Sequence, residues 1–183
     1  EKYIISLIDK KRPKICFLPT ASGDDNLYKL NFYRAFSKLN CKTSHIDLFS
    51  RTENLEEKVL SQDIIFVGGG NTKSMLAVWK EWNLNNILQD AYKNGIVMSG
   101  VSAGAICWFD NGITDSYAKE MSMISCLGIV KGNACPHFDE EKEREPYVND
   151  LIVRKIIKSC ICIEGNCALH IKNDFEYKSI DFG

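Results

Sequence analysis

Short apolar segments alternate with segments of helical periodicity between residues 14 and 109, and this alternation constrains the fold more than any other feature. Apolar or alternating runs typical of strands occupy residues 14–19, 44–48, 63–68 and 95–99. Amphipathic runs typical of helices occupy residues 26–40, 55–61, 72–79, 84–93 and 103–109. Strands that alternate with helices in this way predict an α/β fold with a mostly parallel sheet flanked by helices.

The remainder of the chain follows a looser pattern. Residues 111–145 are expected to be rich in loops, and a helix is expected over residues 148–158. Three short segments, 160–163, 168–171 and 175–180, predict hairpins at a sheet edge. Near the start, residues 3–8 fit a strand or a helix equally well. Because no repeat or composition break interrupts the 183 residues, we expect residues 1–183 to form one domain.

Composition argues against nucleic-acid and membrane binding. The formal net charge is −1 and the pI is about 6.4, so no basic stripe is available for phosphates. No apolar run approaches the roughly 20 residues that span a bilayer. The eight cysteines lie mostly inside apolar segments, which predicts a reducing, cytoplasmic location. The chain opens on Glu1 without an initiator Met, so part of the natural N-terminus could precede it.

One group of residues raises the question of a metal. Cys160, Cys162, Cys167 and His170 have a spacing that could supply four zinc ligands. Cysteines in alternating apolar strands are more often small core residues, however. We therefore expect neither a metal nor another cofactor.

The segment Gly100-Val-Ser102-Ala-Gly104 matches the nucleophile-elbow pattern G-x-S-x-G. It stands directly after an expected buried strand and directly before an expected helix, where the pattern has its mechanical meaning. The glycines permit a sharp turn that would present the Ser102 hydroxyl above the end of the strand. The alternative is a tight turn with Ser102 as a helix cap, as in a non-catalytic, flavodoxin-like binding module.

A second glycine-rich loop, residues 68–72, also follows a buried strand and precedes a helix. The loops after neighbouring parallel strands meet at one sheet edge, so a glycine N–H of this loop could join the N–H of Ala103 in an oxyanion hole. Phosphate binding is the weaker interpretation, because Thr72 rather than glycine precedes Lys73 and the P-loop spacing fails. Asn71 is also suited to cap the following helix.

A serine nucleophile needs a base, and the chain has three histidines. His45 and His170 fall in expected strands, where a structural histidine is the simpler interpretation. His137 follows a proline in the loop-rich stretch and is the best candidate for the base. The carboxylates that could orient its imidazole are Asp110, Asp115, Asp139 and Glu164, and their distances from it are not set by one sequence.

Four motifs occur in the same order as in the peptidase E family of serine peptidases, which this chain therefore resembles. They are the GGGNT loop (68–72), the elbow GVSAGA (100–105), Thr114-Asp115-Ser116 and Pro136-His137-Phe138. The family contains aspartyl dipeptidases and cyanophycinase relatives. The resemblance implies a flavodoxin-like three-layer sandwich related to class I glutamine amidotransferases, with a C-terminal β-hairpin region.

The resemblance also implies roles for individual residues. Ser102 would be the nucleophile, His137 the base and Asp115 the acid of the triad. Gly70 and Ala103 would supply the oxyanion N–H groups. Arg144 and Asn71 would bind the substrate.

The expected activity is therefore that of a single catalytic domain which hydrolyses short peptides through an acyl-enzyme. Dipeptides with an N-terminal aspartate are the substrates that the resemblance implies, and Arg144 suits their side-chain carboxylate. The acidic segment 139–143 would repel such a carboxylate, which favours a different, cyanophycinase-like specificity as the alternative. The sequence predicts a small peptide substrate and no nucleic-acid or membrane partner, and it leaves the oligomeric state unknown.

Overall fold

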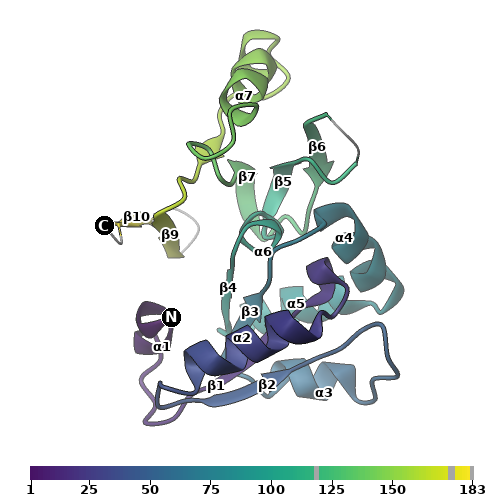
Figure 1. Ribbon diagram of the computed structural model, residues 1–183, viewed down its shortest axis with the longest axis vertical. Coiled ribbons are helices and arrows are strands. Elements are labelled where there is room, and N and C mark those ends of the chain that lie inside the picture. Colours follow the sequence, from purple (N-terminus) through teal and green to yellow (C-terminus); the bar gives the residue numbers. More distant parts are fainter. Residues whose placement is uncertain (118–119, 173–175, 182–183) are drawn as a thin grey trace. The chain divides into compact units, whose positions relative to one another are not determined.

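The chain forms two compact units, residues 1–105 and residues 106–183 (Figure 1). The computed structural model describes residues 1–117, 120–172 and 176–181. A single domain over residues 1–183 stays a prediction.

Four parallel strands form the sheet of the first unit, in the order β2-β1-β3-β4. They are β1 (Lys14–Leu18), β2 (Lys42–His45), β3 (Ile64–Val67) and β4 (Val97–Gly100). In the register of this sheet Phe17 lies opposite Phe66, and Val67 lies opposite Gly100. Because the strands are parallel, the loops that follow β3 and β4 leave the sheet at the same edge.

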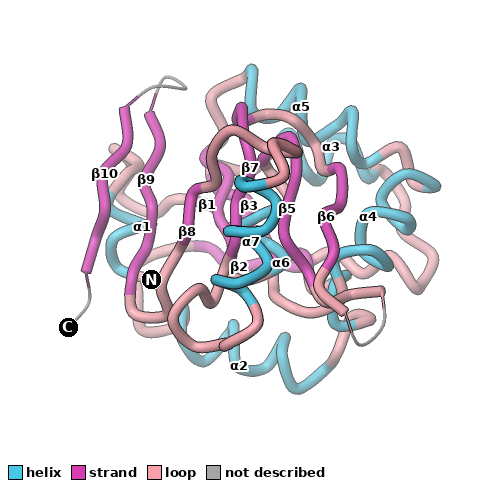
Figure 2. Tube along the Cα trace, turned by 90° about the horizontal axis from the view of Figure 1, so that it is seen from above, coloured by secondary structure: helices cyan, strands magenta, loops and turns pink. Residues whose placement is uncertain are grey.

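Helices cover both faces of this sheet. They are α1 (Lys2–Ser6), α2 (Asn26–Phe36), α3 (Leu55–Leu60), α4 (Thr72–Glu81) and α5 (Leu84–Lys93), with a 3-10 turn, η1, over Thr20–Ser22. Figures 1 and 2 show α2 on one face and α3 and α5 on the other. The segment at residues 3–8, which fitted a strand or a helix, forms α1 and the turn after it.

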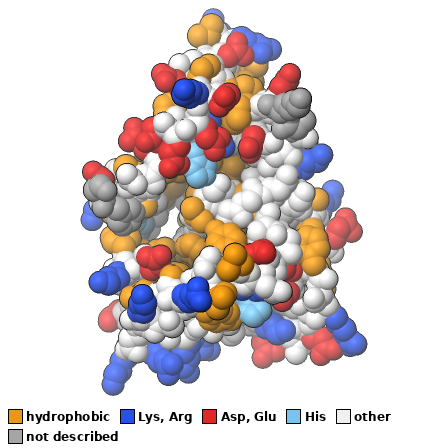
Figure 3. Space-filling view, in the orientation of Figure 1, with side chains coloured by type: hydrophobic (Ala, Val, Ile, Leu, Met, Phe, Trp, Pro, Cys, Tyr) orange, Lys and Arg blue, Asp and Glu red, His pale blue; other side chains and the backbone are white. Residues whose placement is uncertain are grey.

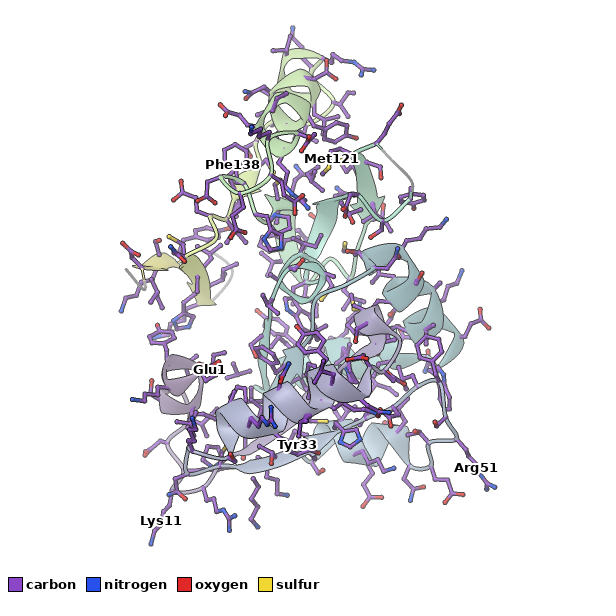
Figure 4. All side chains as sticks on the ribbon, in the orientation of Figure 1. Glu1, Lys11, Tyr33, Arg51, Met121 and Phe138 are labelled. Atoms are coloured by element: carbon purple, nitrogen blue, oxygen red, sulfur yellow. The ribbon has the colours of Figure 1, made fainter. Side chains whose placement is uncertain are left out.

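Aromatic side chains hold α2 against the sheet. Phe32 and Phe36 of α2 are buried, while Tyr33, labelled in Figure 4, is partly buried and packs against the same cluster. The ring of Phe32 stacks on that of Phe17 in β1 with centroids 4.7 Å apart. Burial of such rings contributes roughly 1.5–3 kcal/mol each, so this contact helps to hold α2 on β1.

The second unit contains a four-stranded mixed sheet and a separate hairpin (Figure 2). The sheet order is β6-β5-β7-β8, with β5 (Phe109–Thr114), β6 (Ser122–Ser125), β7 (Val130–Cys135) and β8 (Ile161–Cys162). β5 pairs antiparallel with β6 and parallel with β7, and β7 pairs parallel with β8. β9 (Cys167–Lys172) and β10 (Glu176–Asp181) form the predicted C-terminal antiparallel hairpin.

Two sequence expectations need correction in this unit. The stretch expected to be loop-rich contains β5, β6 and β7, and the helix expected over 103–109 ends at Ile106, as α6 (Ala103–Ile106). A Cβ on Gly112 would lie 2.7 Å from Cδ1 of Ile106, so β5 turns back against this helix end. The position of β5 against Ile106 depends on tertiary contacts. The hydrophobic periodicity of the sequence therefore does not predict it.

Helix α7 (Arg144–Val153) packs on the mixed sheet. Val148 and Leu151 from α7 join Ile113 and Cys135 in a buried cluster, with Phe138 and Met121, both labelled in Figure 4, packed beside it. The helix begins four residues before the expected position 148. Pro146 lies in its first turn, where a missing backbone N–H costs nothing.

Two features of the described residues bear on the class of function. No helix among them is long and apolar enough to cross a membrane. Within the same residues, no group of three or more histidine, cysteine or acidic side chains is placed to hold a metal ion. The eight cysteines are all free thiols.

Candidate active site

Ser102 occupies the apex of a sharp turn between β4 and α6. Its φ is +56°, a left-handed conformation that costs a residue with a side chain about 1–3 kcal/mol. Hydrogen bonds hold the turn on both sides: the N–H of Val101 donates to the carbonyl of Val67 at 3.1 Å, and that of Gly104 donates to the carbonyl of Val101 at 2.9 Å. The elbow predicted from G-x-S-x-G therefore forms, with the strained backbone that such elbows need.

The two glycines of the elbow are required by close backbone approach. A Cβ on Gly100 would lie 2.3 Å from the carbonyl oxygen of Gly104, and one on Gly104 would lie 2.2 Å from the carbonyl oxygen of Val67. Neither contact can be relieved by rotating a side chain, because both partners are backbone. The elbow thus packs directly against the end of β3.

The glycine loop after β3 lies beside Ser102. A Cβ on Gly69 would be 3.1 Å from Cβ of Ser102. Gly70 has a φ of +137°, and a Cβ there would overlap the carbonyl oxygen of Ala21 at 2.2 Å. The loop is therefore confined between the η1 segment and the elbow, as expected for two loops at one edge of a parallel sheet.

Two backbone N–H groups near Ser102 make no hydrogen bond within the described part of the chain. Among the residues that the structure describes, the N–H groups of Gly70 and Ala103 have no acceptor, whereas Gly69 donates to the Tyr28 hydroxyl and Asn71 donates to the carbonyl of Ala21. Unbonded N–H groups on two loops that meet at a serine are the donors that an oxyanion hole requires.

His137, in the second unit, follows β7 and Pro136. Its φ is +52°, and its carbonyl accepts hydrogen bonds from the N–H groups of Glu140 and Glu141, both at 3.1 Å. This turn brings the Glu140 carboxylate to 2.5 Å from Nδ1 of His137. Figure 3 shows acidic side chains grouped beside a histidine in the upper part of the view.

Glu140 is itself held by the segment that follows β8. A Cβ on Gly165 would lie 2.4 Å from Cδ of Glu140, and the N–H of Gly165 donates to the Asp139 side chain at 2.8 Å. Glu140 was not among the acids expected to contact His137. Its position three residues after the histidine, within one turn, was the only signal in the sequence.

The four expected acids lie elsewhere in the same unit. Asp115 is exposed just beyond β5, and Glu164 is exposed after β8. Asp110 accepts hydrogen bonds from the Gly132 N–H and the Lys131 ammonium, and these interactions lower the pKa of its carboxyl. Asp139 accepts the bond from Gly165. None of the four is recorded in contact with His137 among the described residues.

The two expected substrate-binding side chains have partners within the protein. Arg144 is only 3% exposed; its Nε and Nη2 lie 2.8 and 2.7 Å from Oε2 of Glu141, and Nη1 donates to the carbonyl of Ile113. Asn71 caps α4, because its side chain accepts the N–H of Ser74 at 2.8 Å. Binding of a substrate carboxylate by Arg144 would thus require exchange with Glu141.

Comparisons with known proteins give a consistent result. The model of Peptidase family S51 matches residues 1–176. The chain is 45% identical over 181 residues to the uncharacterized peptidase YgaJ of Bacillus subtilis, covering 98% of this chain and 78% of that protein. It is 27% identical over 145 residues to the uncharacterized peptidase Lmo0363 of Listeria monocytogenes, covering 72% of this chain and 68% of that protein.

Solved structures share the fold. A crystal structure from Listeria monocytogenes EGD-e, of a protein assigned to peptidase E, superposes with a TM-score of 0.73 at 18% identity, covering 100% of this chain and 93% of that one. A peptidase from an acI-B1 actinobacterium gives a TM-score of 0.61 at 16% identity, covering 100% and 87%. The predicted α/β class, with parallel strands flanked by helices and a C-terminal hairpin, is confirmed.

Proposed function

The chain belongs to peptidase family S51 and is a serine-type peptidase, and on that premise we propose that it hydrolyses dipeptides with an N-terminal aspartate through an acyl-enzyme on Ser102. The observation that carries this proposal is the strained Ser102 turn, with the unbonded N–H groups of Gly70 and Ala103 on the two loops around it. That combination suits attack on a carbonyl group and stabilisation of the oxyanion that results.

In the proposed reaction, Oγ of Ser102 attacks the peptide carbonyl carbon while Nε2 of His137 takes the hydroxyl proton. The N–H groups of Gly70 and Ala103 bind the oxyanion of the tetrahedral intermediate. The imidazolium then gives its proton to the leaving amine, and the peptide C–N bond breaks to leave an ester on Ser102. Water, deprotonated by the same imidazole, hydrolyses this ester and restores the serine.

For the third member of the triad we propose Asp115, as the family resemblance implies. Glu140 is the alternative, and its support is the contact with Nδ1 of His137. Either carboxylate would accept a hydrogen bond from the Nδ1–H group and so leave Nε2 as the basic nitrogen. Because Nδ1 carries a single proton, it donates its hydrogen bond to one carboxylate. Removing that carboxylate should therefore lower activity more than removing the other.

Specificity for aspartate is proposed to depend on Arg144, whose planar guanidinium suits a carboxylate. The substrate carboxylate would replace that of Glu141 on Nε and Nη2. Asn71 adjoins Gly70 and is proposed to contact the substrate near the scissile carbonyl. A cyanophycinase-like preference for cationic substrates is the second candidate, because Arg144 is already neutralised and exposed Glu140 and Glu143 would attract a positive charge.

Dipeptidase activity and a cytoplasmic location are also proposals. The supporting observation for the second is that all eight cysteines are free thiols, as a reducing compartment would keep them. The substrate class that family membership supports is a peptide.

The test is a hydrolysis screen with Asp-Leu, Asn-Leu and Leu-Leu, together with labelling by a fluorophosphonate, which reacts with activated serines. We expect Asp-Leu to be cleaved fastest, and we expect the label on Ser102 and its loss in Ser102→Ala. Equal cleavage of the three peptides would exclude aspartyl selectivity but keep the serine mechanism. An unlabelled wild-type protein that still cleaves peptides would exclude Ser102 as the nucleophile.

A further inference from the structure

Tyr28 reaches the glycine loop from the first turn of α2. Its backbone N–H donates to the Asp25 side chain at 2.7 Å, which caps the helix and fixes where Tyr28 stands. Its ring meets that of Phe17 edge-on, with centroids 5.1 Å apart and planes at 68°. A Cβ on Gly68 would lie 2.9 Å from Cε1 of Tyr28, so the loop passes directly over this ring.

The hydroxyl of Tyr28 accepts the N–H of Gly69 at 2.9 Å. Gly69 is the residue of the loop that lies against Ser102. The hydroxyl therefore holds a peptide group next to the proposed nucleophile without itself being part of either loop.

The hydrogen bonds of three successive peptide groups show what this contact does. The N–H of Gly69 is bound by Tyr28, and the N–H of Asn71 is bound by the carbonyl of Ala21 at 2.8 Å. The N–H of Gly70 lies between them and has no acceptor among the described residues. Each peptide group is planar, so once the two outer groups are anchored only the rotations about φ and ψ at Gly69 and Gly70 remain, and these must satisfy both anchors; the orientation of the middle group is thereby restricted.

We propose that Tyr28 is a positioning residue for the oxyanion hole: its hydroxyl anchors the Gly69 peptide so that the neighbouring Gly70 N–H stays directed at the developing oxyanion. Glycine residues at 68–70 have wide conformational freedom, and without the anchor the loop would populate other orientations. Preorganised donors are effective because they need not be reoriented during the reaction. This inference rests on the proposed function of Ser102 and Gly70.

The experiment compares Tyr28→Phe with Tyr33→Phe. Both substitutions remove one hydroxyl from α2, but the Tyr33 hydroxyl bonds to Nδ1 of His45 at 2.6 Å rather than to the glycine loop. The phenylalanine ring at position 28 keeps the packing on Phe17. We would measure the maximal rate and half-saturation concentration of fluorophosphonate labelling at Ser102, with Tm as a control for stability.

Loss of a direct oxyanion donor lowers rates by about 10²–10³-fold, and loss of its anchor should cost roughly tenfold. We expect Tyr28→Phe to label about tenfold more slowly at saturation, with a half-saturation concentration within about twofold of wild type, and Tyr33→Phe to match wild type. If the substitution only destabilised the fold, Tm would fall, and the maximal rate would not change independently of the half-saturation concentration.

Equal maximal rates in the two variants would overturn the role of Tyr28 while leaving Ser102 as the nucleophile. A change confined to the half-saturation concentration would also overturn it, since Tyr28 would then act in binding. Absence of label from the wild-type protein would instead overturn the proposed function, and the inference with it.

Discussion

The carboxylate of Glu140 lies 2.5 Å from Nδ1 of His137, three residues earlier in the same turn. This contact places a carboxylate beside the imidazole that is expected to act as the base. The carboxylate that contacts the histidine and the carboxylate that the reaction needs can therefore be different residues. Substitution at each candidate acid shows which one the reaction needs.

We predict that Asp115→Asn lowers kcat/KM by about 10²-fold or more, because it removes the charge that would stabilise the imidazolium. Glu140→Gln should lower it less than about tenfold, because Asp115 and not Glu140 is the proposed acid of the triad. Steady-state kinetics on the best dipeptide of the screen distinguish the two. The reverse order of effects would make Glu140 the acid of the triad.

Two substitutions at Ser102 should distinguish the loss of the nucleophile from the relief of backbone strain. Ser102→Ala and Ser102→Gly should each lower turnover on the order of 10³-fold or more, because both remove the nucleophile. Glycine accepts the left-handed φ of +56°, so Ser102→Gly should be more stable to urea than Ser102→Ala by about 1 kcal/mol. Equal stability of the two variants would mean that the elbow is not strained.

Gly104→Ala should disrupt the elbow, because its Cβ would lie 2.2 Å from the backbone oxygen of Val67. We expect a loss of about 1–3 kcal/mol in unfolding free energy, as for other overpacked sites, and loss of fluorophosphonate labelling. Gly132→Ala is the control for steric overlap, since its Cβ would meet no atom within 4 Å and only its φ of +104° disfavours the substitution. Retained labelling in Gly104→Ala would contradict the close approach of β3 and the elbow.

The exchange of Glu141 for substrate on Arg144 can be tested directly. Glu141→Gln removes the competing charge, so it should lower KM for Asp-Leu several-fold and leave KM for Leu-Leu unchanged. Glu143→Gln is a matched control, because it removes the same charge from a neighbouring position, the N-cap of α7. If Glu141→Gln altered both substrates equally, Arg144 would have a structural role only.

Thiol reactivity should follow burial. Burial raises the pKa of Cys16 to about 12 and that of Cys126 to about 12. A raised pKa leaves the thiol neutral near pH 8, and only the thiolate reacts with a disulfide reagent. Exposed Cys162 should therefore react first in the native protein, and Cys16 only after unfolding. Mass spectrometry of the labelled peptides would show the order, and rapid labelling of Cys16 would contradict the packing of β1.

The sequence by itself determined the α/β class and the elbow, because both depend on neighbours along the chain. Periodicity places strands and helices, and the two elbow glycines mark where backbone segments approach too closely for a Cβ. The paired glycines around Ser102 thus predicted a turn that the structure contains.

Contacts between distant segments were decided only by the tertiary structure. The strands between residues 109 and 135 depend on the pairing of β5 with β6 and with β7, and Gly112 in β5 lies against Ile106. Arg144, for which the family resemblance implies a substrate carboxylate, is buried on Glu141 and the Ile113 carbonyl, and no spacing in the sequence signals the second partner. The hydrogen bond from Gly69 to Tyr28, which are 41 residues apart in the sequence, likewise depends on the tertiary structure. Local pattern specifies which face of an element is apolar, whereas the partner of a polar group depends on which segments pack together, and this is settled when the chain folds.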